Sequence, residues 1–401
     1  MRIDRIRTLR LPEHANLVHV LVESDDGVSG LGETFIGAAA VEAYIHETVA
    51  PALLGQDPLA IEAHARRLSG VLGRAGAGVE SRGNSAVDIA LWDLFGKVTG
   101  QPLYQLLGGR SRRAVRIYNT CAGYGYTRGA GTGVGSDNWG LDEAEPPGPY
   151  EDLQAFLTDA GTLAESLLEQ GVTAMKIWPF DTIAEETHGQ EITTTQLRAG
   201  LEPLRQIRER VGDAMDVMLE FHSMWSLPAA LRITAAADEY RPYWYEDLLP
   251  TQELDGLRRI ADRTRTPLTL SETVAGTTNF RRLFASGAVG IAMADVGWLG
   301  GVTAARKVAA IAESHGLPIA PHDCTGPVVL ATSAHLSAHL PNGFLQETVR
   351  AFYTSWYRDL VVELPVIADG TITPSDAPGH GIELQPDLFS REDAVLVESR
   401  R

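Results

Sequence analysis

Cysteines and long apolar runs are scarce in this chain. It contains only two cysteines, Cys121 and Cys324, and no CxxC motif, so we expect neither a disulfide framework nor a structural zinc site. No apolar run approaches the roughly 18 residues that a membrane-spanning helix needs. The first residues, MRIDRIRTLRLPEHANL, lack the continuous apolar core of a signal peptide. These absences favour a soluble, cytoplasmic protein that does not enter a membrane.

Positive charge is also in short supply. The chain has 34 lysines and arginines against 52 aspartates and glutamates, which gives a formal net charge of −18. Proteins that bind nucleic acids need a cationic surface for the phosphate backbone, so we expect no nucleic-acid partner. The deficit does not exclude an anionic substrate, because a bound divalent cation can invert the local field of an acidic site.

What the chain does have is enough apolar material for a large core. Of its 401 residues, 44% are apolar and 21% are charged, a composition that suits a barrel domain together with a smaller domain. Residues 1–112 begin with strand-like alternation and continue with two helical patterns, starting near Pro58 and Asn84, so we expect an α+β domain there. We expect residues 351–401, with weak strand signals, to return to that domain.

The middle of the chain, residues 113–350, repeats one pattern eight times. Short apolar runs alternate with segments that are mostly of helix length. The runs are VRIYNTC (115–121), TAMKIWP (173–179), DVMLEFH (216–222), YWYEDL (243–248), PLTLSET (267–273), GIAMADV (290–296), LPIAPHD (317–323) and GFLQET (343–348). Eight such β-α units predict an α/β fold with a closed TIM-type barrel of parallel strands. A doubly wound open sheet is the alternative.

One long irregular segment, residues 122–150, follows the first of these runs. It is rich in glycine and proline. Loops longer than about 12–15 residues are uncommon and often form lids or binding loops. The tryptophan and tyrosines within the segment favour a lid over a disordered insertion.

Three glutamates end consecutive strands of the predicted barrel. They are Glu220, Glu246 and Glu272. In a barrel, functional side chains gather where the strands end, and Mg²⁺ prefers several oxygen ligands in octahedral geometry. A single glutamate at such a junction is more often a solvated helix cap. Three in successive apolar strands would be costly buried charges without a partner, so we expect a Mg²⁺ site.

Four further polar residues lie at strand ends. Asp295 and His322 end neighbouring strands, where a carboxylate can orient an imidazole and make it a general base. Alone, His322 would more often be a structural histidine. His222 lies two residues after Glu220 and so on the same strand face, where it either reacts or bonds a neighbouring loop. Lys176, within the apolar run AMKIW, needs a partner, either one of the glutamates or a substrate carboxylate.

Together these residues resemble the enolase superfamily, and within it the mandelate-racemase-like branch. The stretch AVDIALWDLFGKVTGQPLYQLLGG (86–109) is similar to a family signature, and WLGG (298–301), Glu347 and the strand-end acids match by position. The resemblance covers nearly the whole chain and implies an N-terminal α+β capping domain over a modified (β/α)₇β barrel. It also implies that bound Mg²⁺ stabilises an enediolate formed by removal of the proton α to a carboxylate. Members commonly form dimers or octamers, so we expect a homo-oligomer.

Two positions discriminate between reactions within this branch. Racemases carry Lys-x-Lys on the second strand, whereas this chain has Lys176 followed by Trp178, so the second base is missing. Dehydratases of sugar acids carry an acid-x-His pair on the third strand, which is similar to Glu220 and His222 here. The resemblance therefore favours a dehydratase over a racemase.

The resemblance also implies a role for each residue. His322 removes the α-proton and Asp295 orients it, while His222 protonates the leaving β-hydroxyl. Lys176 and Glu347 bind the substrate carboxylate. We expect Mg²⁺-dependent dehydration of a sugar acid to a 2-keto-3-deoxy acid. The alternatives are a racemase, epimerase or cycloisomerase of another carboxylate, and a non-catalytic barrel that binds a ligand.

Overall fold

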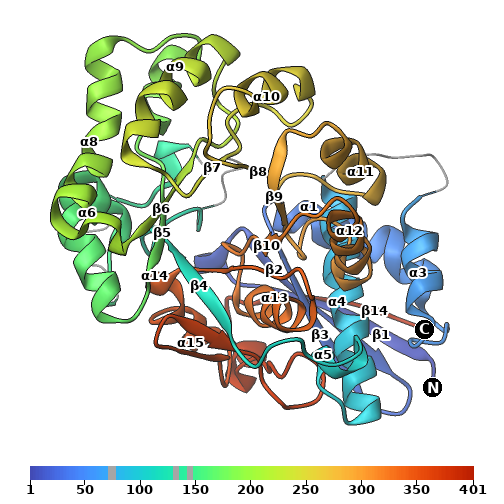
Figure 1. Cartoon of the computed structure of the whole chain (residues 1–401). Helices are drawn as coiled ribbons and strands as arrows, with labels where there is room; N and C mark the ends of the chain where they lie inside the picture. Colours follow the sequence, from blue (N-terminus) through green and yellow to red (C-terminus); the bar gives the residue numbers. More distant parts are fainter. Residues whose placement is uncertain (71–77, 130–134, 142–147) are drawn as a thin grey trace.

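An antiparallel sheet at the N-terminus and a barrel of parallel strands make up the fold (Figure 1). The computed structural model describes residues 1–70, 78–129, 135–141 and 148–401. The predicted lid therefore lies partly outside the described residues, at 130–134 and 142–147. No helix in the described ranges is long and apolar enough to cross a membrane.

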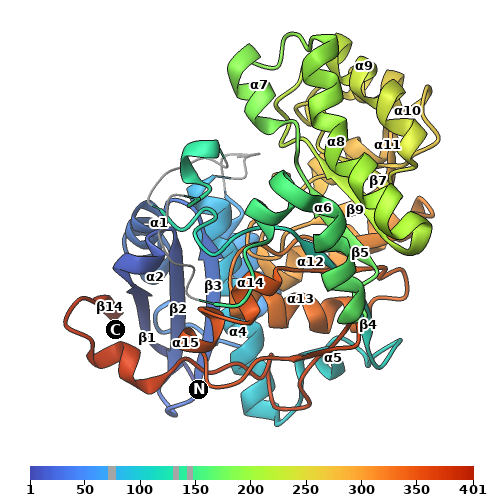
Figure 2. The ribbon, with the colours of Figure 1, turned by 90° about the vertical axis from the view of Figure 1, so that its left-hand side faces the viewer.

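The N-terminal sheet has the strand order β14-β1-β2-β3, and all neighbours in it are antiparallel. Its strands are β1 (Ile3–Arg10), β2 (Leu17–Ser24), β3 (Ser29–Phe35) and β14 (Val395–Arg400). The helices that follow β3 are α1 (Ala38–Tyr44), α2 (Ala50–Leu53), α3 (Ile61–Leu68), α4 (Val79–Thr99) and α5 (Leu103–Leu106). Strand β14 comes from the far end of the chain, and Figure 2 shows this red segment leaving the barrel to reach the sheet.

Strand β3 and helix α4 contact each other backbone to backbone. A Cβ at Gly30 would lie 1.9 Å from the carbonyl oxygen of Ala90, and one at Gly32 would lie 1.8 Å from that of Ala86. Only glycine leaves room for so close an approach. The contact holds the end of β3 and the beginning of α4 in a fixed relation, which matters because both reach the mouth of the barrel.

Two helices begin at different residues from those the sequence indicates. Helix α3 begins at Ile61 rather than near Pro58, because Asp57 closes a separate turn by accepting a hydrogen bond from the Leu59 amide at 2.9 Å. Helix α4 begins at Val79, ahead of Asn84. The sequence does not reveal this start, because the first turn contains polar residues and shows no apolar periodicity.

Each of the eight predicted runs coincides with one barrel strand, although β9 begins one residue before its run. The strands are β4 (Val115–Thr120), β5 (Ala174–Ile177), β6 (Asp216–Glu220), β7 (Trp244–Glu246), β8 (Leu268–Leu270), β9 (Val289–Ala294), β10 (Ile319–Pro321) and β11 (Gln346–Thr348). Strands β10 to β4 pair in reverse chain order, and β11 lies beside β4. A parallel bridge between Ile319 and Gly343 closes the ring. The barrel prediction is therefore confirmed, and the open doubly wound sheet is wrong.

Helices follow the barrel strands in the predicted alternation. They are α6 (Asp152–Glu169), α7 (Asp181–Thr187), α8 (Thr194–Val211), α9 (Leu227–Ala237), α10 (Leu254–Ala261), α11 (Thr277–Ala285), α12 (Gly301–Ser314) and α13 (Pro327–His339). The eighth strand, β11, is followed only by two helices of four residues each, α14 (Arg350–Tyr353) and α15 (Tyr357–Leu360). The barrel therefore has seven β-α units and a final strand, the (β/α)₇β pattern.

The C-terminal part adds a small hairpin before it returns to the first sheet. Strands β12 (Val366–Ala368) and β13 (Thr371–Thr373) pair with each other, and β13 pairs with β4. The Arg401 amide donates a hydrogen bond to the Asp4 carbonyl at 3.0 Å, so the two termini lie together. The domain boundaries suggested by the sequence, at 112/113 and 350/351, stay predictions.

Candidate active site

The polar layer of the site follows directly from the apolar layer beneath it. An apolar cluster fills the interior of the barrel, with members Tyr118, Ala174, Met218, Trp244, Ile291, Met293, Ala320 and Leu345. Side chains alternate along a strand, so the residue two positions further on points to the same interior. Those residues are Thr120, Lys176, Glu220, Glu246, Asp295, His322 and Glu347. The strand period thus brings most of the predicted site residues to one end of the barrel.

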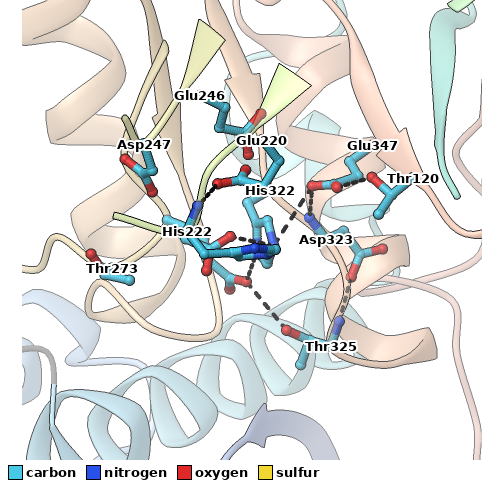
Figure 3. Close-up of polar contacts among 12 residues, drawn as sticks. Thr120, Glu220, His222, Glu246, Asp247, Thr273, His322, Asp323, Thr325 and Glu347 are labelled. Carbon is cyan, nitrogen blue, oxygen red and sulfur yellow. Dashed lines mark hydrogen bonds and ion pairs between the residues drawn. The ribbon is translucent and has the colours of Figure 1, made fainter. Parts of the chain in front are cut away.

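The three predicted metal ligands meet at this end. Figure 3 shows two of them, Glu220 and Glu246. One carboxylate oxygen from each of Glu220, Glu246 and Glu272 lies within 4.8 Å of the other two, and all three side chains are buried. Glu220 Oε2 has no hydrogen-bond partner among the described residues. Buried carboxylates with too few donors repel each other, and a cation that prefers oxygen ligands relieves the repulsion. The residues present therefore fit Mg²⁺.

The three carboxylates differ in their tendency to ionise. Burial raises the pKa of Glu246 well above its usual value, and the charge of Glu220 adds to the effect although Lys176 opposes it. Burial also acts to raise the pKa of Glu272, but the neighbouring His322 outweighs it and lowers that pKa to about 2. Cations on either side, Lys176 and His322, therefore offset only part of the negative charge of the cluster.

Lys176 is one of these cations. Its Nζ lies 2.6 Å from Glu246 Oε1, 2.9 Å from Glu347 Oε1 and 3.6 Å from Glu220 Oε2. Burial acts to lower the pKa of this ammonium group, but the charges of Glu246 and Glu347 outweigh it and raise the pKa well above its usual value. Lys176 therefore stays charged, and it lines the cavity where an anionic ligand would enter.

His322 and Asp295 form a buried pair. Asp295 Oδ2 lies 2.6 Å from His322 Nδ1 and also accepts a hydrogen bond from Thr325 Oγ1 at 3.2 Å. His322 Nε2 lies 2.9 Å from Glu272 Oε2. Burial acts to lower the pKa of His322, but the charge of Glu272 leads the effects that raise it well above its usual value. The Asp295 contact fixes one side of the ring at Nδ1, and Nε2 faces Glu272 at the wall of the cavity.

Residues of the N-terminal part lie behind this pair. The ring of Trp298 lies 5.2 Å from that of His322, and the Arg82 guanidinium lies 4.1 Å from the centre of the Trp298 ring. Arg82 also donates a hydrogen bond to the Phe35 carbonyl at 2.7 Å, and Ser81 donates one to the Trp298 carbonyl at 2.8 Å. The first turn of α4 therefore holds the loop that covers His322.

His222 lies across the barrel from His322, because β6 and β10 are four strands apart in either direction around a ring of eight. Its Nδ1 is 2.5 Å from Asp181 Oδ2, and its Nε2 is 3.4 Å from the hydroxyl of Tyr126. Burial acts to lower the pKa of His222, but the charges of Asp181 and Glu220 outweigh it and raise the pKa to about 9.

The backbone at His222 differs from the sequence prediction. Strand β6 ends at Glu220, and His222 has a φ of 46°, so it belongs to a left-handed turn rather than to the strand face. Its amide donates a hydrogen bond to Glu220 Oε1 at 2.6 Å, which holds the turn against the acidic cluster. The side chain nevertheless lines the cavity, as expected from its position at the strand end.

Lys176, His222, Glu272, His322 and Glu347 all line one cavity at the barrel mouth. Glu220, Glu246 and Asp295 lie close to it but do not line it. The cavity also has walls that the sequence did not single out as individual residues: Phe35, Ile36, Thr120, Tyr126 and Thr127. Tyr126 and Thr127 belong to the segment 122–150 that the sequence favours as a lid. Thr120, which donates a hydrogen bond to Glu347, follows the same strand-end rule as the others and could have been found. Tyr126 and Asp181 carry no spacing signal that connects them to His222.

Two family models match the chain. The model for the mandelate racemase / muconate lactonizing enzyme N-terminal domain matches residues 8–108, and the enolase C-terminal domain-like model matches residues 159–388. The chain belongs to the mandelate racemase branch of the enolase superfamily. Family membership confirms the resemblance seen in the sequence and agrees with the capped barrel.

Similar proteins cover nearly the whole length of this family member. D-galactonate dehydratase from Pectobacterium atrosepticum is 28% identical over 399 residues, which are 97% of this chain and 93% of that protein. D-xylonate dehydratase from Haloferax volcanii is 28% identical over 405 residues, 99% and 89% of the two chains. A solved structure of an enolase of the mandelate racemase subgroup from Agrobacterium tumefaciens is 46% identical, with a TM-score of 0.88, and covers 100% of this chain and 99% of that one.

Proposed function

We propose that this family member is a Mg²⁺-dependent dehydratase of a sugar acid, a hydro-lyase that yields a 2-keto-3-deoxy acid. The observation that carries the proposal is the pair of imidazoles on opposite sides of one cavity, each with Nδ1 against a buried aspartate. Elimination of a β-hydroxyl needs a base for the α-proton and a separate acid for the leaving oxygen. The dehydratase names of the relatives support the same class of reaction.

The substrate carboxylate would lie beside Lys176 and Glu347, which are 2.9 Å apart at the cavity wall. The ammonium group of Lys176 supplies an opposite charge. Burial acts to raise the pKa of Glu347, but the charges of Lys176 and His322 lower it below its usual value. An arriving carboxylate raises the Glu347 pKa again by like-charge repulsion, so Glu347 can take up a proton and donate a hydrogen bond to the substrate.

The reaction then divides between the two imidazoles. His322 Nε2 takes the α-proton while Asp295 holds the other side of its ring. The electrons of the C–H bond first move into the substrate carboxylate and leave a dianionic intermediate, and in a second step they form a carbon–carbon double bond as the β carbon–oxygen bond breaks. His222 gives a proton to the departing oxygen, which leaves as water, and the resulting enol tautomerises to the 2-keto acid. Bound Mg²⁺, held by Glu220, Glu246 and Glu272, would stabilise the negative charge that develops on the substrate carboxylate.

A two-base reaction finds less support in the cavity. Racemases of the branch carry a second lysine where this chain has Trp178, which lines the cavity and packs edge-on against His222. An indole ring cannot accept the α-proton on that side. This residue is the reason for preferring elimination to racemisation or epimerisation.

The test is incubation of the protein and Mg²⁺ with a library of aldonates and aldarates, including D-galactonate and D-xylonate, with detection of 2-keto acids. We expect product from at least one acid and none without Mg²⁺. Exchange of the α-proton in D₂O without loss of water would instead indicate a racemase, epimerase or cycloisomerase. Metal binding without product or exchange across the library would favour a non-catalytic barrel. A homo-oligomeric dimer or octamer stays a prediction for light scattering.

A further inference from the structure

Asp181 is a buried carboxylate with one side-chain partner, His222, among the described residues. It is the first residue of helix α7, and its side chain is 1% exposed. Its Oδ2 lies 2.5 Å from His222 Nδ1, while its Oδ1 has no hydrogen-bond partner in the described part of the chain. Burying a carboxylate is costly, and a merely structural carboxylate usually satisfies both oxygens with several donors. Asp181 instead directs its contact to one imidazole.

The contact determines which nitrogen of His222 faces the cavity. With Nδ1 against Asp181, Nε2 points to the side where the Tyr126 hydroxyl lies, 3.4 Å away. The backbone of His222 lies in a left-handed turn and is tied to Glu220 through its amide. That tie places the Cα and Trp178 packs edge-on against the ring, but neither contact selects which ring nitrogen faces the cavity. Asp181 supplies the short contact that holds the ring itself.

The arrangement has a counterpart across the cavity. Asp295 Oδ2 lies 2.6 Å from His322 Nδ1, so both rings are held at Nδ1 by a buried aspartate. The two aspartates are independent, because Asp295 follows β9 while Asp181 follows β5. A change at Asp181 should therefore affect His222 and leave the His322 pair in place.

We propose that Asp181 is a positioning residue that orients His222, so that Nε2 of the imidazole faces the leaving hydroxyl. The proposal rests on the proposed function for the step that His222 performs. It predicts a selective defect: loss of Asp181 impairs the release of water but spares removal of the α-proton by His322.

The first experiment needs no substrate. Crystal structures with Mg²⁺ are determined for the wild type, Asp181→Asn and Asp181→Ala. We expect the wild-type ring to contact Asp181, the asparagine variant to keep the ring by accepting from Nδ1, and the alanine variant to show it rotated or spread over several positions. An unmoved ring in the alanine variant, with an intact metal site, would overturn the proposal. If alanine prevents folding, the asparagine variant and His222→Asn carry the test through the kinetics below.

The second experiment uses the acids that the wild type dehydrates. Formation of the 2-keto acid and exchange of the α-proton in D₂O are followed by NMR. Loss of a group that orients a functional histidine typically costs about 10- to 100-fold in activity, so we expect that loss in dehydration for Asp181→Ala, a smaller loss for Asp181→Asn, and nearly unchanged exchange. A parallel fall in exchange and dehydration would indicate a general structural role and would count against the proposal.

A double variant and a control complete the test. If Asp181 acts only through His222, adding Asp181→Asn to His222→Asn should cause no further loss, whereas an additive loss would contradict the proposal. Glu186→Gln, on the same helix, removes an exposed carboxylate, and it should leave the ratio of exchange to dehydration unchanged. If the wild type dehydrates no acid, the proposed function fails, while the crystal structures still decide the role of Asp181.

Discussion

The two sides of the cavity use the same pair of residue types but are built differently. On one side, Asp295 and His322 directly follow the neighbouring strands β9 and β10. Trp298 packs against His322, and the N-terminal part holds Trp298 in place. On the other side, His222 lies in a left-handed turn, and Asp181 begins a helix after a connecting loop. We call these the base side and the acid side. The base side is built from strand ends and a covering domain, and the acid side from connecting segments.

This difference matches the division of labour that we propose. Removing the α-proton demands a fixed distance between a base and a carbon atom, which rigid strand ends provide. The acid that protonates the leaving oxygen must meet a β-hydroxyl whose configuration differs between sugar acids. Segments outside the strands can vary between family members without disturbing the barrel. The construction of the acid side therefore suits a determinant of substrate choice.

The largest expected effect is the loss of both activities, α-proton exchange on the base side and dehydration on the acid side. Chelation of Mg²⁺, or Glu246→Gln within the carboxylate cluster, should abolish both α-proton exchange and dehydration. Ligand binding to the folded state also adds about 2.7 kcal/mol of stability at a concentration 100 times the Kd, so Mg²⁺ should raise the Tm in thermal unfolding. The exposed Glu209→Gln should keep the Tm increase and the activity. If Mg²⁺ raised the Tm of Glu246→Gln as much as that of the wild type, the ion would bind elsewhere.

A pair of variants should then separate the two sides. His322→Asn should lose exchange and dehydration together, by about 10² to 10⁴-fold, because it removes the only proposed base. His222→Asn should lose dehydration to a similar extent but keep α-proton exchange in D₂O. His188→Asn, an exposed histidine at the end of α7, serves as the control and should match the wild type. If His222→Asn also lost exchange, the two sides would not be separable and the assignment of roles would be wrong.

The same contrast explains what the sequence could and could not predict. The base side could be predicted because the strand period and the strand order place Asp295 and His322 next to each other. The strand period also predicts that Lys176 and Glu347 point into the same end of the barrel. The acid side was only half accessible. His222 follows a strand end, but its left-handed turn and its partner Asp181 depend on how loops fold back, and loop geometry has no period. Tyr126 could not be found for the same reason.

The cover over the base side escaped the sequence for a different reason. Arg82 lies in the first turn of α4, where polar residues hide the start of the helix, so the periodicity gave no sign of it. Its contact with Trp298 also spans the two parts of the chain. Such contacts depend on how two distant parts of the chain pack against each other. The fold was therefore predictable from repeated local patterns, whereas the contacts between its two parts were not.

A third effect concerns that cover. The Arg82 guanidinium stacks on Trp298, which lies against His322, so Arg82→Met should loosen the base side. A stacked cation contributes about 0.5–2 kcal/mol, which corresponds to a loss of roughly two- to thirtyfold in α-proton exchange. Arg306→Met removes a similar stack on Trp92 at 5.4 Å and leaves the cavity untouched, so it should exchange at the wild-type rate. Equal losses in both variants would mean that the effect is one of general stability.

The last effect concerns stability rather than activity and lies behind the base side, in helix α13, which begins shortly after His322. His335 on this helix is fully buried, accepts a hydrogen bond from the Tyr104 amide at 3.2 Å, and has a pKa that burial lowers from 6.5 to about 3. The folded protein therefore keeps His335 neutral between pH 6.5 and 3, while the unfolded chain takes up a proton. The stability that His335 contributes therefore falls as the pH drops below 6.5, because at this group the unfolded state binds more protons.

The variant His335→Gln tests the direction and the size of this pH-dependent loss of stability. Glutamine keeps a donor and an acceptor near the Tyr104 amide and the His380 carbonyl but does not titrate. For a single group with these pKa values, the loss of stability between pH 7.5 and pH 5 is about 2 kcal/mol. Urea unfolding at the two pH values should therefore show a loss about 2 kcal/mol smaller in the variant than in the wild type. An identical loss would mean that His335 is protonated in the folded state, so that α13 is less tightly packed behind the base side than the structure shows.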